Sequence, residues 1–469
     1  MWLELVVVGL AGYIAGWLGA VCAATLIFVW RVIPASEGPP VLKLAMTTQW
    51  IQVSVGVFYV PLVGHELEAN RSSDYVTMVL IGLGCIAAFS VGFALGKKFM
   101  MRRKAYPPIA PMEMTTLGTL VIIYVVGVVV TGLLQEIAFN YPTYTQALIA
   151  LSLGRMALIY LMLRRLSRPV LRWELILALL SFEVLIGFTG YFSSFKEPLL
   201  LAALALLENF DARKKSHWLV SAALGGVLIF VCVMWMGVRG QYRQDYDDEL
   251  YAASRSERLE HMQALVTDWF NSEQSPATDD LDFLVDRAWA IYYPALAVHR
   301  VPSVLPFENG ALMKAVLVHL TTPRILYPNK PDLPSESELV RKYSGVMVAG
   351  AEQNTTIAFG YAAESYVDFG IPFMFLPMLI VGIGIGAAYE WLLRSIAHRD
   401  LAVAVVTSTF WINLYMFERS WAKILGLLIT MLVYVGLVAW VVDRWLLMRY
   451  AAVMPAESDA GEPMYGMDQ

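Results

Sequence analysis

The feature that most constrains this chain is a series of apolar runs, each long enough to form a helix that crosses a lipid bilayer. A crossing helix needs about 20 residues to span the hydrocarbon core. Eleven such segments are predicted, at residues 3–30, 44–64, 75–96, 114–134, 144–163, 173–191, 198–210, 217–237, 371–393, 401–417 and 422–443. Segment 198–210 is short and could be re-entrant or tilted. The sequence therefore predicts an all-α, polytopic integral membrane protein with about eleven transmembrane helices.

Composition agrees with this class. Hydrophobic residues make up 58% of the 469 residues and charged residues 16%, which is too apolar for a soluble domain of this length. The net charge of -5 argues against a nucleic-acid partner. Cys22, Cys85 and Cys232 lie within apolar runs, so we interpret them as small core residues. The histidines show no ligand spacing, and neither a metal ion nor a cofactor is expected.

Basic residues determine the predicted orientation, because Lys and Arg in short connections stay on the cytoplasmic side. They cluster at 97–104, 164–172, 213–215 and 394–399, and with eleven crossings all four clusters lie inside. The N-terminus is then outside and the C-terminus inside. The predicted parts are an N-terminal transmembrane bundle (1–237), a large extracytoplasmic loop with short helices (238–370), C-terminal transmembrane helices (371–445) and a cytoplasmic tail (446–469).

The loop contains a proline-rich run that presents two cations. Apolar residues recur at helical spacing over 281–299 and 311–320, which indicates short amphipathic helices. Prolines at 323, 328, 331 and 334 then prevent a regular helix and favour an extended path. Arg324 and Lys330 on this path are suited to bind a lipid-linked phosphate, because a guanidinium can bind two phosphate oxygens. In the alternative, Arg324 caps a helix end or pairs with Asp332.

A pair of carboxylates follows where the loop meets the next apolar run. Glu364 and Asp368 are four residues apart, so a helix would place both on one face. Facing the cations, one of them could act as general base for a sugar hydroxyl, and we favour Glu364 for this role. The alternative is a helix N-terminus enriched in acids because of the helix dipole.

Three further charged or small-residue features lie in the apolar runs. Arg155 and Glu183 are predicted near mid-depth, where an unpaired charge is costly, so they should pair with each other or line the path of a polar substrate. Lys196, beside Glu197 at the outer end of its helix, is better placed than Arg155 for a phosphate. Gly382, Gly384 and Gly386 lie inside a predicted span, where close helix packing explains them better than nucleotide binding.

Three motifs together resemble a known family. They are Pro306-Phe-Glu-Asn-Gly310, Pro323-Arg-Ile-Leu-Tyr-Pro-Asn-Lys-Pro331 and Gly360-Tyr-Ala-Ala-Glu-Ser-Tyr-Val-Asp-Phe-Gly370, followed by a membrane span. Their order and placement in one large loop resemble the bacterial oligosaccharide repeat-unit polymerases, the Wzy-like or O-antigen polymerase group. One departure is that the loop lacks an arginine followed after ten positions by glycine, a spacing found in some members.

The resemblance implies a fold, an activity and partners. It implies a GT-C-like inner-membrane glycosyltransferase that polymerises undecaprenyl-pyrophosphate-linked oligosaccharide repeat units into a surface polysaccharide, with a chain-length regulator protein as a further partner. Glu364, Asp368 and Arg324 would be catalytic. Substrate-binding residues would be Arg324, Lys330, Lys196, Arg155, Tyr361 and Tyr366. An O-antigen ligase and a flippase for lipid-linked oligosaccharides are the alternative functions, although no matching halves typical of transporters are found.

Overall fold

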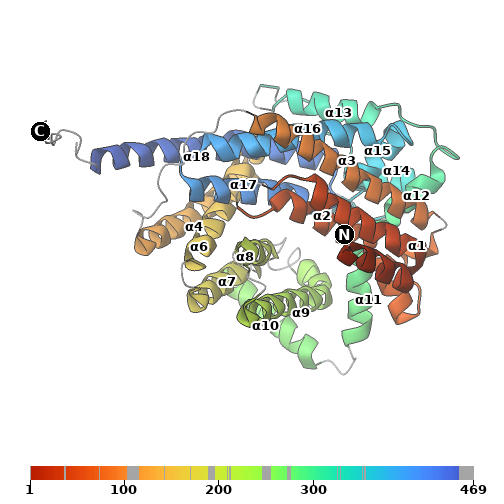
Figure 1. Ribbon diagram of the computed structural model, residues 1–469, viewed down its shortest axis with the longest axis horizontal. Helices are drawn as coiled ribbons and strands as arrows, with labels where there is room; N and C mark the ends of the chain where they lie inside the picture. Colours follow the sequence, from red (N-terminus) through yellow and green to blue (C-terminus); the bar gives the residue numbers. More distant parts are fainter. Residues whose placement is uncertain are drawn as a thin grey trace, which may run out of the picture.

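The computed structural model describes residues 2–35, 38–72, 74–102, 116–141, 143–168, 171–188, 196–208, 210, 213–245, 255–271, 276–324, 326–327, 329–350, 352 and 355–453. These residues form 18 α-helices and one 3₁₀ helix (Figure 1). The helices are α1 (Trp2–Val32), α2 (Val41–Val63), η1 (Ala69–Arg71), α3 (Tyr75–Met101), α4 (Leu117–Asn140), α5 (Thr145–Leu153), α6 (Arg155–Leu166), α7 (Trp173–Phe188), α8 (Lys196–Glu208), α9 (Lys215–Asp245), α10 (Arg255–Asn271), α11 (Pro276–Ala288), α12 (Tyr292–Arg300), α13 (Ala311–Thr321), α14 (Glu336–Ser344), α15 (Tyr361–Phe369), α16 (Phe375–Ser395), α17 (Arg399–Leu414) and α18 (Trp421–Val453).

Each predicted span corresponds to a helix, or in one case to the pair α5 and α6. Seven are long and apolar enough to cross a membrane: α1, α3, α4, the pair α5–α6, α9, α16 and α18. The other four predicted spans do not meet these criteria of length and hydropathy. Helices α7, α8 and α17 are too short, with 16, 13 and 16 residues, and α2 is too polar, because it carries Lys43, Gln49 and Gln52. The protein is therefore an all-α, multi-pass membrane protein with seven candidate spans in its described part, fewer than the eleven predicted.

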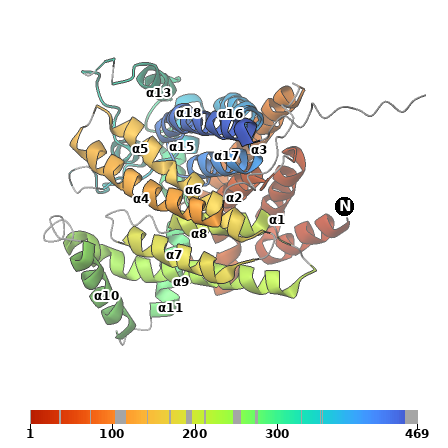
Figure 2. The ribbon, with the colours of Figure 1, turned by 90° about the vertical axis from the view of Figure 1, so that its left-hand side faces the viewer.

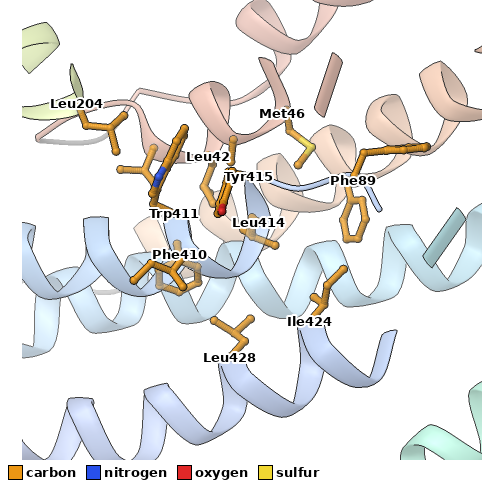
Figure 3. Close-up of a cluster of buried hydrophobic side chains, with 14 of the residues drawn as sticks. Leu42, Met46, Phe89, Leu204, Phe410, Trp411, Leu414, Tyr415, Ile424 and Leu428 are labelled. Atoms are coloured by element: carbon orange, nitrogen blue, oxygen red, sulfur yellow. The ribbon is translucent and has the colours of Figure 1, made fainter. Parts of the chain in front are cut away.

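Helix α17 is the centre of the bundle. Every residue from Leu401 to Leu414 is buried, and the helix contacts α2, α6, α16 and α18 (Figure 2). Its last residues pack between neighbouring helices: Phe410, Trp411, Leu414 and Tyr415 lie near Leu42, Met46 and Phe89 on one side and near Ile424 and Leu428 of α18 on the other (Figure 3). A helix buried on all sides carries apolar residues around its circumference, which explains why the sequence of α17, in spite of the buried polar residues Thr407, Ser408, Thr409 and Asn413, reads as a membrane span.

The most extensive helix contact joins α3 and α16. Glycines allow it: a Cβ added to Gly96 would lie 2.0 Å from the carbonyl oxygen of Ile383, and one added to Gly386 would lie 2.4 Å from that of Phe93. Close packing thus explains Gly386, and also Gly382, whose Cβ would lie 3.0 Å from the carbonyl oxygen of Phe89. Gly384 does not face α3, since a Cβ at this position would meet no atom within 4 Å.

Helix α1 is folded back on itself, so although its 31 residues are long and apolar enough to cross a membrane, its shape differs from the single straight crossing predicted. Its backbone leaves helical geometry at Ala15 and Gly16, where Gly16 has φ of 65°. Glu4 and Arg31 form an ion pair, although a straight helix would separate them by about 40 Å at a rise of 1.5 Å per residue. The two halves therefore form a hairpin, and residue 2 lies at the same end of the bundle as Arg31.

The bundle has two chemically different ends. At one, which we call the basic end, Lys97 at the end of α3 donates to the carbonyl of Pro34 (2.8 Å), and Arg164 at the end of α6 pairs with Glu208 of α8 and Asp400 of α17. Helices α12, α14 and α15 lie at the opposite end, which we call the α15 end (Figure 1). The predicted loop is thus partly built into the bundle, because α12 and α15 pack on α3. Most of the predicted tail, 454–469, lies outside the described residues.

Candidate functional site

The connection between α17 and α18, residues Tyr415-Met-Phe-Glu-Arg-Ser420, is the point where the α15 end meets the core. The amide of Tyr361, the first residue of α15, donates to the carbonyl of Arg419 (2.7 Å). Ser420 starts α18, because its hydroxyl accepts from the amide of Lys423 (3.3 Å), as is common at helix N-termini. These contacts fix the end of the connection that leads into α18.

Two glutamines of α2 fix the backbone of this connection from inside the core. Gln49 donates to the carbonyl of Leu414 (2.6 Å), and Gln52 donates to that of Tyr415 (2.8 Å) while accepting from the amide of Phe417 (2.9 Å). Buried amides that are fully hydrogen-bonded specify one arrangement, since any other leaves a polar group unsatisfied. This network explains Gln49 and Gln52, two of the three polar residues that exclude α2 from the apolar spans.

Six charged or hydroxylated residues gather on this connection, and we call them the connection cluster: Lys196, Glu197, Arg287, Tyr415, Glu418 and Arg419. The Tyr415 hydroxyl donates to Glu197 Oε1 (3.3 Å), and Arg287 pairs with Glu418 (3.1 Å). The Arg419 guanidinium lies 5.7 Å from the centre of the Tyr415 ring, at cation–π distance. Lys196 interacts electrostatically with Glu197 and Glu418. The connection cluster therefore combines three cations with two carboxylates.

The connection cluster can bind an anion and accept a proton. Arg287 is half exposed, with 45% of its side chain accessible, so the cluster can be reached from outside. The second carboxylate oxygen of Glu197, Oε2, is buried and has no hydrogen-bond partner in the described part of the chain. Such an unsatisfied acceptor is costly unless a ligand completes it. A hydroxyl group bound beside the cations would do so.

Glu364 and Asp368 lie on one helix face, as the i, i+4 spacing predicts, and both are buried. Asp368 accepts hydrogen bonds from the amides of Leu312 (3.0 Å) and Met313 (2.7 Å), in the first turn of α13. That helix begins after Gly310, which has no side chain to cap it. Asp368 therefore caps α13 from a neighbouring helix.

Glu364 has a comparable relation to α18. Its Oε2 accepts from the amide of Trp421 (3.0 Å), and the neighbouring Ser365 accepts from the Trp421 indole (2.7 Å). Burial raises the pKa of Glu364 to about 8, and the nearby acids Glu336 and Asp368 add to the increase. Glu336 is itself paired with Lys423 (2.6 Å). Glu364 is thus mostly a neutral acid at pH 7.

The two cations of the proline-rich run have partners within the run or next to it. Arg324 pairs with Asp332, which is the alternative that the sequence left open, and Lys330 donates to the carbonyl of His319 (2.9 Å). Burial and the nearby Arg324 lower the pKa of Lys330. The described residues of the run form successive turns between Pro323 and Lys330 rather than the extended path predicted. Among the described residues, neither cation forms an ion pair with Glu364 or Asp368.

The remaining predicted residues are engaged with protein groups. Tyr361 is fully buried and donates to Gln49 (2.7 Å), and Tyr366 donates to the carbonyl of Val301 (3.0 Å). Arg155 pairs with Glu183 (3.2 Å), as expected for charges at membrane depth. Substrate contact by these side chains stays a prediction. Of the predicted residues, Lys196 is the one that joins the connection cluster.

The sequence contained one signal for this cluster that the motif search missed. Glu418 and Arg419 are two charges in a short connection between the apolar runs 401–417 and 422–443, and ionisable groups at such a place are functional candidates. No spacing rule, however, connects them with Lys196 or Arg287, which lie more than 100 positions earlier.

Comparisons with known proteins gave one match. A family model described as a domain of unknown function (DUF8712) matches residues 77–393, from α3 to α16. No curated protein and no solved structure matches the chain. The matched stretch contains Lys196, Glu197 and Arg287 and ends before Tyr415. Because the match covers more than half of the chain, the protein belongs to the family of the domain of unknown function DUF8712.

Proposed function

We propose that this protein is a membrane glycosyltransferase that polymerises undecaprenyl-pyrophosphate-linked oligosaccharide repeat units into a cell-surface polysaccharide. The three loop motifs that resemble the repeat-unit polymerases motivate the substrate class. The observation that carries the proposal is the connection cluster, which combines Lys196, Arg287 and Arg419 with Glu197, whose Oε2 is buried and has no hydrogen-bond partner in the described part of the chain. Cations beside an orphan acceptor suit a pyrophosphate leaving group and a sugar hydroxyl.

The proposed step is a substitution at the anomeric carbon of the growing glycan. The bond from this carbon to the undecaprenyl pyrophosphate oxygen breaks, and a new bond forms to a hydroxyl oxygen of the incoming repeat unit. The hydroxyl proton passes to a carboxylate, for which we assign Glu197, because its Oε2 is unsatisfied beside Lys196. Arg287 and Arg419 stabilise the charge that develops on the pyrophosphate.

The wider setting follows from the same proposal. The protein would lie in a bacterial inner membrane with the α15 end at the outer face, where the lipid-linked repeat units are extended. Crossings by α2, α7, α8 and α17, in addition to the candidate spans other than the α1 hairpin, would give a GT-C-like architecture. A chain-length regulator protein would be its partner in the membrane.

A reconstituted assay tests this function. Purified protein in lipid nanodiscs is given undecaprenyl-pyrophosphate-linked repeat units, and product length is measured by gel electrophoresis. Arg419→Ala should lower extension by about 10- to 100-fold, because a charge-assisted bond to phosphate contributes roughly 1.5–3 kcal/mol. Arg419→Lys should recover only part of it, since the guanidinium geometry is lost. Arg31→Ala, at the exposed Glu4 pair of the basic end, is the matched control and should extend normally.

The same assay separates the candidate bases. Glu197→Gln should lower extension about 100-fold or more while leaving substrate binding intact. Glu364→Gln, which tests the base predicted from the sequence, should extend at close to the wild-type rate. Arg324→Ala, which tests the phosphate contact predicted from the sequence, should likewise extend at close to the wild-type rate. If Glu197→Gln is fully active and Glu364→Gln is not, the base is Glu364.

The competing functions give different products in cells. In cells that lack the protein, single repeat units capping the lipid acceptor support a polymerase. Long lipid-linked chains that accumulate without transfer would instead indicate a ligase, and repeat units retained in the cytoplasm would indicate a flippase.

A further inference from the structure

An apolar groove of about 410 Å³ lies between α16 and α18, away from the connection cluster. It is lined by the end of α16, including Leu392 and Ile396, and by the stretch of α18 from Leu432 to Trp440. Leu392 and Ile396 are buried, with 3% and 5% of their surface exposed, so they form its floor. The volume is within the range of small-molecule sites, about 300–1,000 Å³.

The groove has room because α18 places a glycine against α16. A Cβ added to Gly436 would meet one atom, a methyl carbon of Leu392 at 3.9 Å, which is an ordinary contact distance. A larger side chain would therefore extend into the groove without moving the backbone. The space belongs to the surface between two candidate spans, where the surrounding solvent is the lipid bilayer.

The rim of the groove is chemically matched to the end of a lipid. Trp391 and Trp440 are half exposed, and tryptophan prefers the depth of the lipid head groups. One turn beyond Trp440 is Arg444, whose guanidinium lies 5.7 Å from the Trp440 ring centre. Arg444 is exposed and forms no ion pair with a carboxylate in the described part of the chain. The groove thus combines an apolar floor with a tryptophan rim, and Arg444 follows the rim residue Trp440 by one turn of α18.

We propose that the groove between α16 and α18 binds one acyl chain of a phospholipid whose anionic head group is held by Arg444. Charge complementarity selects this occupant, because a zwitterionic head group would bring a cation close to Arg444. Basic pockets between membrane helices bind anionic head groups in the same manner. The proposal is independent of the glycosyltransferase function, since the groove is at the basic end and shares no residue with the connection cluster.

Lipid binding can be counted directly by native mass spectrometry. The purified, delipidated protein is titrated with phosphatidylglycerol and, separately, with phosphatidylcholine. Wild-type protein should bind one phosphatidylglycerol at least tenfold more tightly than phosphatidylcholine. Gly436→Phe fills the groove and should weaken binding of both lipids at this site at least tenfold. Arg444→Gln should retain phosphatidylcholine binding and lose the preference for phosphatidylglycerol.

Gly384→Phe is the matched control. A Cβ at Gly384 meets no atom within 4 Å, so this variant adds the same side chain at an exposed position of α16 rather than at Gly436 of α18. It should bind both lipids as the wild type does, and equal melting temperatures of the two Phe variants would show that Gly436→Phe is folded. Unchanged binding in Gly436→Phe, or an unchanged preference in Arg444→Gln, would overturn the proposal.

Discussion

Glu364 shows how burial changes the chemistry of a single residue. Its carboxyl group faces the first amide of α18 and has two other acids, Glu336 and Asp368, within electrostatic range. Lys423 lies within electrostatic range of the Glu364 carboxyl group, but it forms its ion pair with Glu336. A second buried negative charge would therefore be poorly compensated, so Glu364 keeps its proton.

Protonation of Glu364 should make the stability of the protein depend on pH. The pKa is about 8 in the folded protein and 4.5 for an unperturbed glutamate. Between these values the folded state holds a proton that the unfolded state has released, so the free energy of unfolding falls as pH rises. Glu364→Gln removes this proton. Near pH 5 the two proteins should melt alike, and towards pH 8 the variant should gain about 2 °C or more over wild type in detergent.

A melting-temperature difference that stays constant across this pH range would contradict the assignment of a raised pKa to Glu364. Ser337→Ala, in the neighbouring helix α14, changes a non-titrating residue and should show no such pH dependence.

Asp368 acts through the helix that it caps. Asp368→Ala leaves the amides of Leu312 and Met313 without acceptors, which should destabilise the protein by about 1–3 kcal/mol. Asp368→Asn keeps one acceptor oxygen and should lose less. Hydrogen exchange at the start of α13 should rise in the Ala variant, whereas exchange in α14 should not. Unchanged exchange at Leu312 and Met313 would show that the cap contributes nothing.

At the scale of elements, the tight pair α3 and α16 depends on which glycines face the partner. Gly386→Leu must displace the backbone of Phe93 and should strongly lower the yield of monodisperse protein and its melting temperature. Gly384→Leu, two residues away on the open side, should be tolerated. Size-exclusion chromatography and thermal unfolding measure both, and equal behaviour of the two variants would refute the packing role of Gly386.

Hydropathy predicted the helices well and their role in the bilayer less well. The run 401–417 reads as a span because its residues are buried, and α17, with 16 residues enclosed by other helices, is shorter than the seven candidate spans. A run of apolar residues indicates burial, but burial in protein and burial in lipid produce the same hydropathy pattern in the sequence. The hairpin in α1 was missed for a related reason. A glycine does not interrupt an apolar run in the sequence, yet it permits the positive φ that Gly16 adopts at the turn.

The candidate site was predicted less completely than the fold. Local rules found the i, i+4 pair Glu364 and Asp368, because both are on one helix. The partners of these residues come from elsewhere in the chain: Trp421 for Glu364 and the start of α13 for Asp368. The same applies to Lys196 and Arg419, which only the packing of α8 against the connection brings together. Sequence patterns describe single helices, whereas this site is made by contacts among several.

At the scale of the whole molecule, the fold separates a basic end from the α15 end. Three of the connections that the sequence marked as basic are held by contacts of Lys97 with the carbonyl of Pro34, of Arg164 with Asp400 of α17, and of Arg394 with Glu390 of its own helix. Lys and Arg near membrane helices are retained on the cytoplasmic side. The basic end is therefore expected inside, and the hairpin of α1 places Trp2 there too, in contrast to the orientation predicted for a single crossing.

Cysteine labelling tests this orientation. In a background with Cys22, Cys85 and Cys232 replaced, an impermeant thiol reagent is added to intact spheroplasts. Met347→Cys, at a site 83% exposed near the α15 end, should react. Arg102→Cys, at the end of α3, should react only after lysis. A cysteine in a short tag ahead of residue 1 should also react only after lysis, because the Glu4–Arg31 contact holds both ends of the hairpin on one side. Reaction of the tag together with Met347→Cys would mean that α1 crosses the membrane once, and reaction of Arg102→Cys alone would reverse the whole orientation.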